Sequence, residues 1–455
     1  MKIIIQIGQL LLSLSILIIL HELGHFLFAR LFRTRVEKFY LFFDPWFSLF
    51  KVKKGDTEYG IGWLPLGGYV KISGMIDESM DKEQLKKPPE PYEFRSKPAW
   101  QRLLIMLGGV MVNLLLGGVI FTFILFMYGE KYLPNKNITD GLYITDSIMY
   151  NAGLRTGDKV ISINGVEPVN YTDILEEMLF GGEMLIQRNG KDTTLMLAED
   201  FAGQLADYRI HNQGILLYPR IPFVVAEVPD SSINAGSGLQ SLDRLVSMDG
   251  VPIKYADEVA PLIDTMRNRT IPVVVERNGE RISLQLKISD QGKMEITYPS
   301  LLSYDELDKL GAYEFDKREF TFLQSIPAGF YRAKDELMSY IRQFKLIFNF
   351  KTGAYKAVGG FGAITNLFPP QWHWEAFWTI TAIISIMLAF LNILPIPALD
   401  GGHVTFLIYE IITGRKPGDK FLEYAQIVGM AILLFLILYA NGNDVYRYIL
   451  RLIGK

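Results

Sequence analysis

Two histidines and a glutamate lie inside a run of aliphatic and aromatic residues near the start of the chain. His21, Glu22 and His25 form the pattern H-E-x-x-H. On a helix, positions i and i+4 lie on one face, so the two imidazoles can bind one zinc ion, and Glu22 can accept a proton from water beside it. The alternative is a polar cluster that neighbouring helices satisfy. Because burying ionisable groups in apolar surroundings is costly, a functional reason is favoured.

A catalytic zinc site needs a third protein ligand and a fourth position left for water. The strongest candidate is Asp400, in the segment LNILPIPALDGGH at residues 391–403. Two prolines break the preceding helix there, and an acidic residue at membrane depth is a functional candidate. Alternatively, Asp400 caps the helix that follows it. His403 is the weaker candidate for the third ligand.

Two asparagines also lie in apolar segments. Asn392 precedes Asp400 by eight positions. Its amide could donate a hydrogen bond to a substrate carbonyl as negative charge develops on the oxygen. A hydrogen bond between neighbouring helices explains Asn392 equally well. For Asn113, such a structural hydrogen bond is the expected role.

Four apolar segments are long enough to cross a bilayer, which takes ~20 residues. The chain has 455 residues, 49% of them hydrophobic, and a mean hydropathy of +0.18. It contains no cysteine, which excludes disulfides and thiolate ligands, and its net charge of −3 gives no argument for nucleic acid. The expected transmembrane segments lie at residues 1–32, 102–130, 374–400 and 422–442.

Basic residues set the expected orientation. They follow the first and third spans, so these two loops are expected in the cytoplasm, with both termini and the long second connection on the other side. Basic residues near the carboxyl terminus argue weakly against this. The residues are Arg30, Arg33, Arg35 and Lys38 after the first span, Arg415, Lys416 and Lys420 after the third, and Arg447, Arg451 and Lys455 near the end.

The connection between the second and third spans repeats itself. GLRTGDKVISINGV begins at Gly153 and GLQSLDRLVSMDGV at Gly238, and an Asn-Gly hairpin signal follows each. Two α/β modules are therefore predicted, at residues 137–210 and 211–299. The first resembles a PDZ domain, whereas the second has Leu242 in place of Gly157. Such modules can capture a peptide strand or a carboxyl terminus; alternatively, they are only bulky external caps.

Three further segments have a recognisable pattern. Within the loop 33–101, residues 59–75 combine aromatic and β-branched residues with Gly and Pro, which predicts short strands and a tight turn. In the region 318–370, residues 318–350 predict an amphipathic helix at the membrane surface. The Gly-rich segment 357–370 is expected to be an extended or broken element beside the membrane.

Together these motifs resemble the site-2 protease family of intramembrane zinc metalloproteases, and within it the branch of the bacterial regulator of sigma E protease (RseP). The likeness covers nearly the whole chain through HELGH, LPLGGYVK, the paired inserts and NILPIPALDGGH, in that order. It implies that His21, His25 and Asp400 bind Zn²⁺, that Glu22 is the catalytic acid and base, and that Asn392 handles the substrate.

The resemblance also implies where substrates bind and where the protein works. Its substrates would be single-span transmembrane proteins, such as anti-sigma factors, or remnant signal peptides. The protein would lie in the bacterial inner membrane, with the PDZ-like domains on the periplasmic side, where they exclude bulky substrates. The implied substrate-binding residues are Gly67, Gly68 and Tyr69 in a re-entrant β element, and Gly360, Phe361 and Gly362 in an edge element near the active site.

We therefore expect a polytopic α-helical membrane protein with four transmembrane helices, membrane-associated β elements and two inserted PDZ-like α/β domains. Two other functions fit part of the pattern. A zinc transporter would also carry His and Asp in membrane helices, but it needs further such residues along a path, and the second and fourth spans supply none. A non-catalytic scaffold with a vestigial metal site is disfavoured by the intact Glu22.

Overall fold

The computed structural model describes residues 2–65, 67–75, 88–212, 214–298, 304–309 and 311–453. The chain forms two compact units. The first comprises Met1–Gly129, Glu319–Phe348 and Val358–Lys455, and the second comprises Glu130–Arg318 and Asn349–Ala357. All the expected membrane spans fall in the first unit, and both sequence repeats fall in the second.

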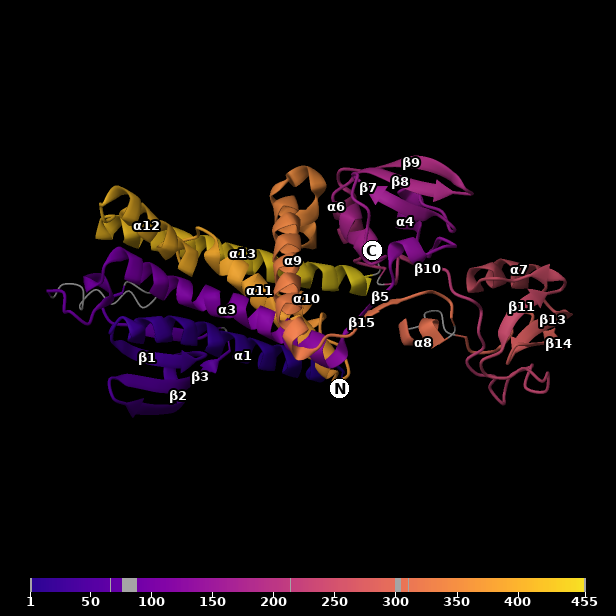
Figure 1. Cartoon of the computed structure of the whole chain (residues 1–455), viewed down its shortest axis with the longest axis horizontal. Coiled ribbons are helices and arrows are strands. Elements are labelled where there is room, and N and C mark those ends of the chain that lie inside the picture. The colour runs from indigo at the N-terminus through magenta and orange to yellow at the C-terminus, as the bar shows by residue number, and fades with distance from the viewer. Residues whose placement is uncertain are drawn as a thin grey trace. The chain divides into compact units, whose positions relative to one another are not determined.

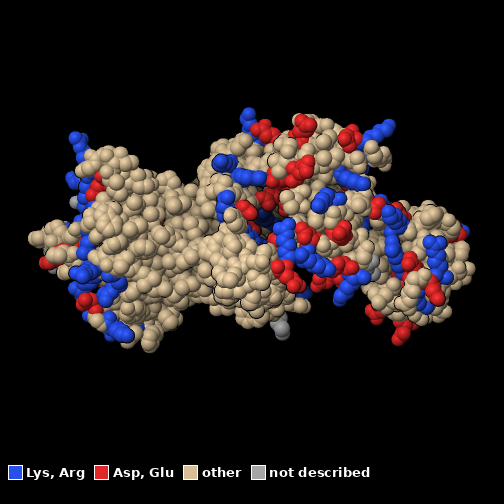
Figure 2. Space-filling view, viewed as in Figure 1, with Lys and Arg blue, Asp and Glu red and all other residues tan. Residues whose placement is uncertain are grey.

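Four helices of the first unit are long and apolar enough to cross a membrane, as the sequence predicts. Figure 2 shows a broad surface over these helices that is almost free of charge, with Lys and Arg gathered at its left end. A surface of this kind suits contact with lipid. The four helices are α1 (Lys2–Leu31), α3 (Ala99–Tyr128), α11 (Trp374–Ile393) and α13 (Asp419–Ile453).

Helix α3 packs against α1, α11, α9 (Phe322–Phe348) and α12 (Asp400–Thr413), and so joins the helices of this unit (Figure 1). The sequence predicts an amphipathic helix at the membrane surface over residues 318–350, and α9 falls within this range and packs on α3. Its residues Ser325, Gly329 and Ala333 are buried and recur every four positions. This stripe of small side chains lets the two helices approach closely.

The third span ends earlier than the sequence predicts. Helix α11 stops at Ile393, and α12 begins at Asp400. Pro395 and Pro397 lie between them, and neither can donate a backbone hydrogen bond to continue a helix. Asp400 therefore stands at a helix start. In contrast, α13 extends beyond the expected 422–442 at both ends.

A four-stranded sheet packs against α1. Its strands are ordered β2-β3-β1-β4, with β1 and β3 parallel and the other pairs antiparallel. The pattern at 59–75 predicts strands there, and β3 and β4 fall on it, whereas β1 and β2 were not predicted. Among the described strands, β4 pairs with β1 alone, so its other edge is open. The bounds are β1 (Val36–Leu41), β2 (Phe43–Lys54), β3 (Thr57–Leu64) and β4 (Tyr69–Ile72).

In the second unit, each sequence repeat contains a strand, a helix and a two-stranded hairpin in that order, and the second copy has a short extra strand, β12, before its helix. Each copy has a hydrophobic core of its own. The two predicted Asn-Gly hairpins join β8 to β9 and β13 to β14. The first copy contains β7 (Lys159–Ile163), α5 (Asp173–Met178), β8 (Gly182–Arg188) and β9 (Lys191–Leu197), and the second contains β11 (Arg244–Met248), β12 (Val251–Pro252), α7 (Val259–Thr265), β13 (Thr270–Arg277) and β14 (Glu280–Lys287).

Smaller elements complete this unit. Strand β5 pairs with β15, and β6 pairs with β10. Part of the first core is supplied by residues beyond the second copy, including Leu307 and Phe315. The elements are β5 (Glu130–Tyr132), β6 (Leu142–Ile144), α4 (Ser147–Asn151), α6 (Phe201–Tyr208), β10 (Leu217–Pro219), α8 (Tyr304–Lys309) and β15 (Asp316–Arg318).

Each copy contains its own ion pair with a buried aspartate, at the same position of the repeat. Asp158 of the first copy binds the Arg188 guanidinium at 2.7 and 2.6 Å. Asp243 of the second binds Arg277 at 2.6 and 2.7 Å. In both copies the same carboxylate also accepts a backbone N–H three residues earlier in the chain. The repeat in sequence therefore corresponds to a repeat in side-chain interactions.

Candidate metal centre

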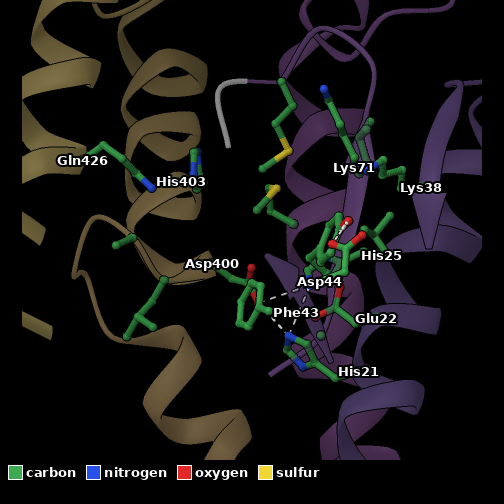
Figure 3. Close-up of a pocket in the computed structure, with 18 of the residues that line it drawn as sticks. His21, Glu22, His25, Lys38, Phe43, Asp44, Lys71, Asp400, His403 and Gln426 are labelled. Atoms are coloured by element: carbon green, nitrogen blue, oxygen red, sulfur yellow. Dashed lines mark hydrogen bonds and ion pairs between the residues drawn. The ribbon is translucent and has the colours of Figure 1, made fainter. Parts of the chain in front are cut away.

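The H-E-x-x-H motif lies on α1, and the carboxylate that starts α12 faces it (Figure 3). His21 Nε2 lies 3.2 Å from Asp400 Oδ2, and His25 Nε2 lies 3.3 Å from the same oxygen. The two Nε2 atoms are 3.3 Å apart. Three residues that the sequence proposes as ligands thus converge, and we call them the His–His–Asp cluster.

The cluster fits a tetrahedral zinc ion. Zinc bonds to nitrogen and oxygen are about 2.0–2.1 Å long, and the edge of such a tetrahedron is about 3.3 Å. The three donor atoms have this spacing. In addition, Asp400 Oδ2 is buried and accepts no hydrogen bond within the described part of the chain. The N-cap residue of α12 is Leu399, so Asp400 does not cap this helix. Its carboxylate faces the two histidines instead.

Glycines let α3 pass directly behind the motif. Gly24 of α1 and Gly108 of α3 are in close backbone contact, and an added side chain at either would collide with the other helix. A Cβ atom on Gly109 would lie 2.5 Å from both His21 Cε1 and His25 Nε2. Helix α3 therefore forms a wall against which both imidazoles rest.

The second nitrogen of each imidazole also has a partner on α3. His25 Nδ1 lies 2.8 Å from the Ile105 carbonyl oxygen, which only accepts, so Nδ1 donates and Nε2 keeps its lone pair for a metal. His21 Nδ1 lies 3.2 Å from the Asn113 amide. The sequence suggested only a hydrogen bond between helices for Asn113. Nothing local in the sequence indicates that its partner is a candidate ligand.

Glu22 and the cluster line one cavity of about 610 Å³. Val70 of β4 lines the same cavity, with its backbone close to the Glu22 carboxylate. A Cβ atom added to Gly68 would lie 2.6 Å from Ile18 Cγ2 and 3.5 Å from Glu22 Cγ. The same Cβ atom would lie 2.8 Å from the Tyr40 carbonyl oxygen, so glycine lets the segment before β4 pack closely against α1 and β1.

The predicted substrate-binding residues lie in two different places. Gly68 and Tyr69 line the cavity, with Gly67 adjacent to them in the chain. The Tyr69 hydroxyl donates to Asp44 at 2.8 Å, and burial together with this hydrogen bond raises the pKa of Tyr69 far above its usual range. This tyrosine is therefore a fixed wall of the cavity and not a proton donor.

Gly360, Phe361 and Gly362 do not line this cavity. They begin a short helix, α10 (Phe361–Thr365), where the sequence suggested an extended or broken element. Asp444 of α13 accepts hydrogen bonds from the Gly360 and Ala363 amides at 3.0 and 3.1 Å. Because a side chain from another helix satisfies these amides, the segment can start a helix despite its glycines.

Two other candidates lie near the cluster. The Asn392 amide nitrogen is 3.4 Å from His21 Nε2, which brings it close to the site as the sequence suggested. His403 lines the cavity, and so does Gln426 of α13, which the sequence did not single out. Among the described residues, His403 does not belong to the group of ligand atoms that could hold one ion.

Comparison with known proteins identifies the family of the chain. The model of peptidase family M50 matches residues 9–436. The chain is 24% identical over 471 residues to the "Regulator of sigma E protease" of Haemophilus influenzae, covering 97% of this chain and 99% of that protein. It is 26% identical over 504 residues to the "Putative zinc metalloprotease" of Thermotoga maritima, covering 96% of this chain and 98% of that protein.

Proposed function

The chain belongs to peptidase family M50, and on this premise we propose that its His–His–Asp cluster cleaves peptide bonds inside the transmembrane segments of single-span proteins. The protein is a membrane zinc metalloprotease of the site-2 type. The observation that carries the more specific proposal is the even spacing of three donor atoms in a unit built of membrane-spanning helices.

His21, His25 and Asp400 would hold the zinc ion, which when bound supplies a Lewis acid at the scissile carbonyl. Glu22 takes a proton from the attacking water and returns it to the leaving amine. Glu22 lines the cavity together with the three residues of the cluster, which places its carboxylate where the attacking water would bind. The side-chain amide of Asn392 donates a hydrogen bond to the substrate carbonyl oxygen as negative charge develops there.

The substrate binds as a strand along β4. A helical substrate hides its carbonyl groups in internal hydrogen bonds, so it has to unwind before it can react. The open edge of β4 offers replacement hydrogen bonds, and Gly68 and Tyr69 place that edge on the cavity wall. Gly67 allows the turn into the strand, since its φ is +149°. Gly360, Phe361 and Gly362 would act from α10 as a second contact for the substrate.

The second unit faces the outside of the bacterial inner membrane. Basic residues after the first and third spans support this orientation. Its two copies act as PDZ-like domains that obstruct substrates with bulky external parts or capture a peptide end. The duplicated fold supports this role, and the natural substrates would be anti-sigma factors or remnant signal peptides.

A zinc transporter is less well supported. Ion passage needs a series of polar groups across the membrane. Helix α3 carries no acidic residue or histidine, and residues 424–440 of α13 carry none either. The one cluster of possible ligands among the described residues is the His–His–Asp cluster, which suits a fixed site.

Metal analysis of the purified chain tests the proposal. His25→Ala and Asp400→Ala should each lose most of the bound zinc and all cleavage of a single-span substrate in nanodiscs. His403→Gln is the matched control, because His403 lines the same cavity without joining the cluster. Full zinc occupancy after removal of His21, His25 and Asp400 in turn would exclude this assignment, and zinc loss in His403→Gln would make His403 a ligand.

A further inference from the structure

A second pocket of the first unit lies where α1 ends. Its volume is about 350 Å³, and it shares no lining residue with the cavity of the metal centre. Its walls are basic and polar, unlike the largely apolar surface of α1. The lining residues are Arg30, Arg33, Thr34, Arg35, Asp56 and Tyr92.

Two buried polar atoms of this pocket have no hydrogen-bond partner within the described residues. They are Thr34 Oγ1 and Arg35 Nε. Thr34 is only 1% exposed, so its hydroxyl does not reach open solvent. A buried donor without a partner is unfavourable, and both atoms can donate. A ligand with several acceptor oxygens would satisfy the two together.

The charge of the pocket points to an anion. Arg30 and Arg33 are exposed and form no ion pair with any carboxylate among the described residues. Arg35 has Asp56 as its counterion, but at 3.8 Å and with both side chains well exposed. Arg30 in the last turn of α1 also favours the negative end of that helix, but this does not explain the buried Thr34 hydroxyl. Several guanidinium groups around acceptor oxygens suit a phosphate group.

The surroundings point to a lipid as the source of that phosphate. Leu27 and Leu31 lie on the same helix face as Arg30 and are 53% and 68% exposed. Trp100 is 53% exposed, and its ring meets Phe32 edge-on at 5.4 Å, as is typical of the membrane interface. We propose that this pocket binds the phosphate of an anionic phospholipid, whose acyl chains lie along Leu27 and Leu31.

Thermal unfolding of the full chain in neutral detergent tests the proposal, with phosphatidylglycerol or phosphatidylcholine added. Phosphatidylglycerol should raise the melting temperature, and phosphatidylcholine should not. The double variant Arg30→Gln/Arg33→Gln should need about 30-fold more phosphatidylglycerol, because each interfacial arginine contributes about 1 kcal/mol and 1.4 kcal/mol is tenfold. Lys51→Gln/Lys53→Gln, which removes the same charge from exposed positions on β2, should titrate like the unmodified chain.

Thr34→Val separates a built site from general attraction to charge. Without lipid this variant should be as stable as the unmodified chain or more so, because it removes an unsatisfied hydroxyl. With phosphatidylglycerol its melting temperature should rise less. An equal response to phosphatidylcholine, or an unchanged titration of Arg30→Gln/Arg33→Gln, would overturn the proposal. The same stabilisation by inorganic phosphate would overturn the lipid assignment in favour of a soluble phosphate.

Discussion

Buried polar side chains are arranged differently in the two units. Inside the two repeats of the second unit, buried carboxylates pair with near neighbours in the chain: Asp158 and Arg188 are 30 positions apart, and Asp243 and Arg277 are 34. In the first unit, the polar residues of the metal centre come from distant parts of the chain: 371 positions separate Asn392 from His21. The ion pairs of the second unit close one module, whereas the cluster of the first forms only when separate helices pack. Polar groups should therefore serve folding in one unit and chemistry in the other.

The largest effect that this comparison predicts comes from Glu22. In Glu22→Gln, cleavage of a single-span substrate should fall by about 10²–10⁴-fold, because amide groups cannot accept and return the proton. Zinc content and melting temperature should stay unchanged, because Glu22 is not part of the His–His–Asp cluster. Cleavage at the normal rate would show that Glu22 is not the general base.

Gly109 tests whether the packing of α3 sets the metal site. In Gly109→Ala the new methyl group would lie 2.5 Å from both imidazoles, so the rings have to move. We expect loss of bound zinc, measured by metal analysis, although no ligand is removed. Gly8→Ala is the matched control on α1, because nothing lies within 4 Å of that position. Normal zinc content in Gly109→Ala would show that the packing of α3 at Gly109 does not position the two imidazoles.

Asn113 offers a smaller and more selective effect. An imidazole that binds metal through Nε2 carries its proton on Nδ1 and needs an acceptor there. The side-chain oxygen of Asn113 can supply it once the amide turns its oxygen toward His21. Asn113→Leu should lower zinc affinity by about 10–100-fold in chelator competition, and Asn113→Asp should restore it. If the unmodified chain, Asn113→Leu and Asn113→Asp bind zinc with equal affinity, Asn113 contributes only to helix packing.

The elements that the sequence predicts correctly are those with local signals. Continuous apolar runs indicate the spans, and Asn-Gly pairs between apolar strands indicate the hairpins of the second unit. Strands β1 and β2 lack such a pattern. In β2, Asp44 and Pro45 interrupt the apolar residues, and the strand forms through its pairing within the sheet. Likewise, α10 is a helix because Asp444, 84 positions from Gly360, satisfies its first amides.

The residues of the candidate site also fall into two groups, those that a local sequence pattern indicates and those that it does not. Residue type and spacing suffice to propose His21, Glu22 and His25, and two prolines before Asp400 indicate the third ligand. Asn113 and Gly109 carry no such mark, because an asparagine or glycine in an apolar helix is usually a packing residue. Their contacts with the imidazoles depend on the register between α1 and α3, which no short stretch of sequence determines.

In the second unit, a lost ion pair should affect stability alone. Asp158→Asn removes the counterion of Arg188 and one acceptor for the Arg155 amide, and should cost about 1–3 kcal/mol of that unit's unfolding free energy. Asp192→Asn is the control, since it removes the same charge from an exposed position on β9. Zinc content should stay unchanged in both variants. Zinc loss in Asp158→Asn would show that the second unit supports the metal centre.

The smallest predicted effect distinguishes the two copies from each other. Leu242 has φ +70°, and the matching Gly157 has φ +93°. A left-handed backbone costs a non-glycine residue about 1–2 kcal/mol, and the Leu242 side chain is 73% exposed, so little packing offsets the strain. Leu242→Gly should therefore stabilise the second copy, by about 0.5–1 kcal/mol after the greater freedom of glycine in the unfolded chain is subtracted.

The reverse change, Gly157→Leu, should destabilise the first copy by at least about 1 kcal/mol, although nothing lies within 4 Å of the new Cβ atom. Chemical denaturation of the full chain, followed by hydrogen exchange at β8 and β13, measures the two copies separately. Destabilisation by Leu242→Gly would mean that Leu242 contributes a contact that outweighs its backbone strain. The divergence of the second copy would then be an adaptation of its surface and not a tolerated loss of a turn glycine.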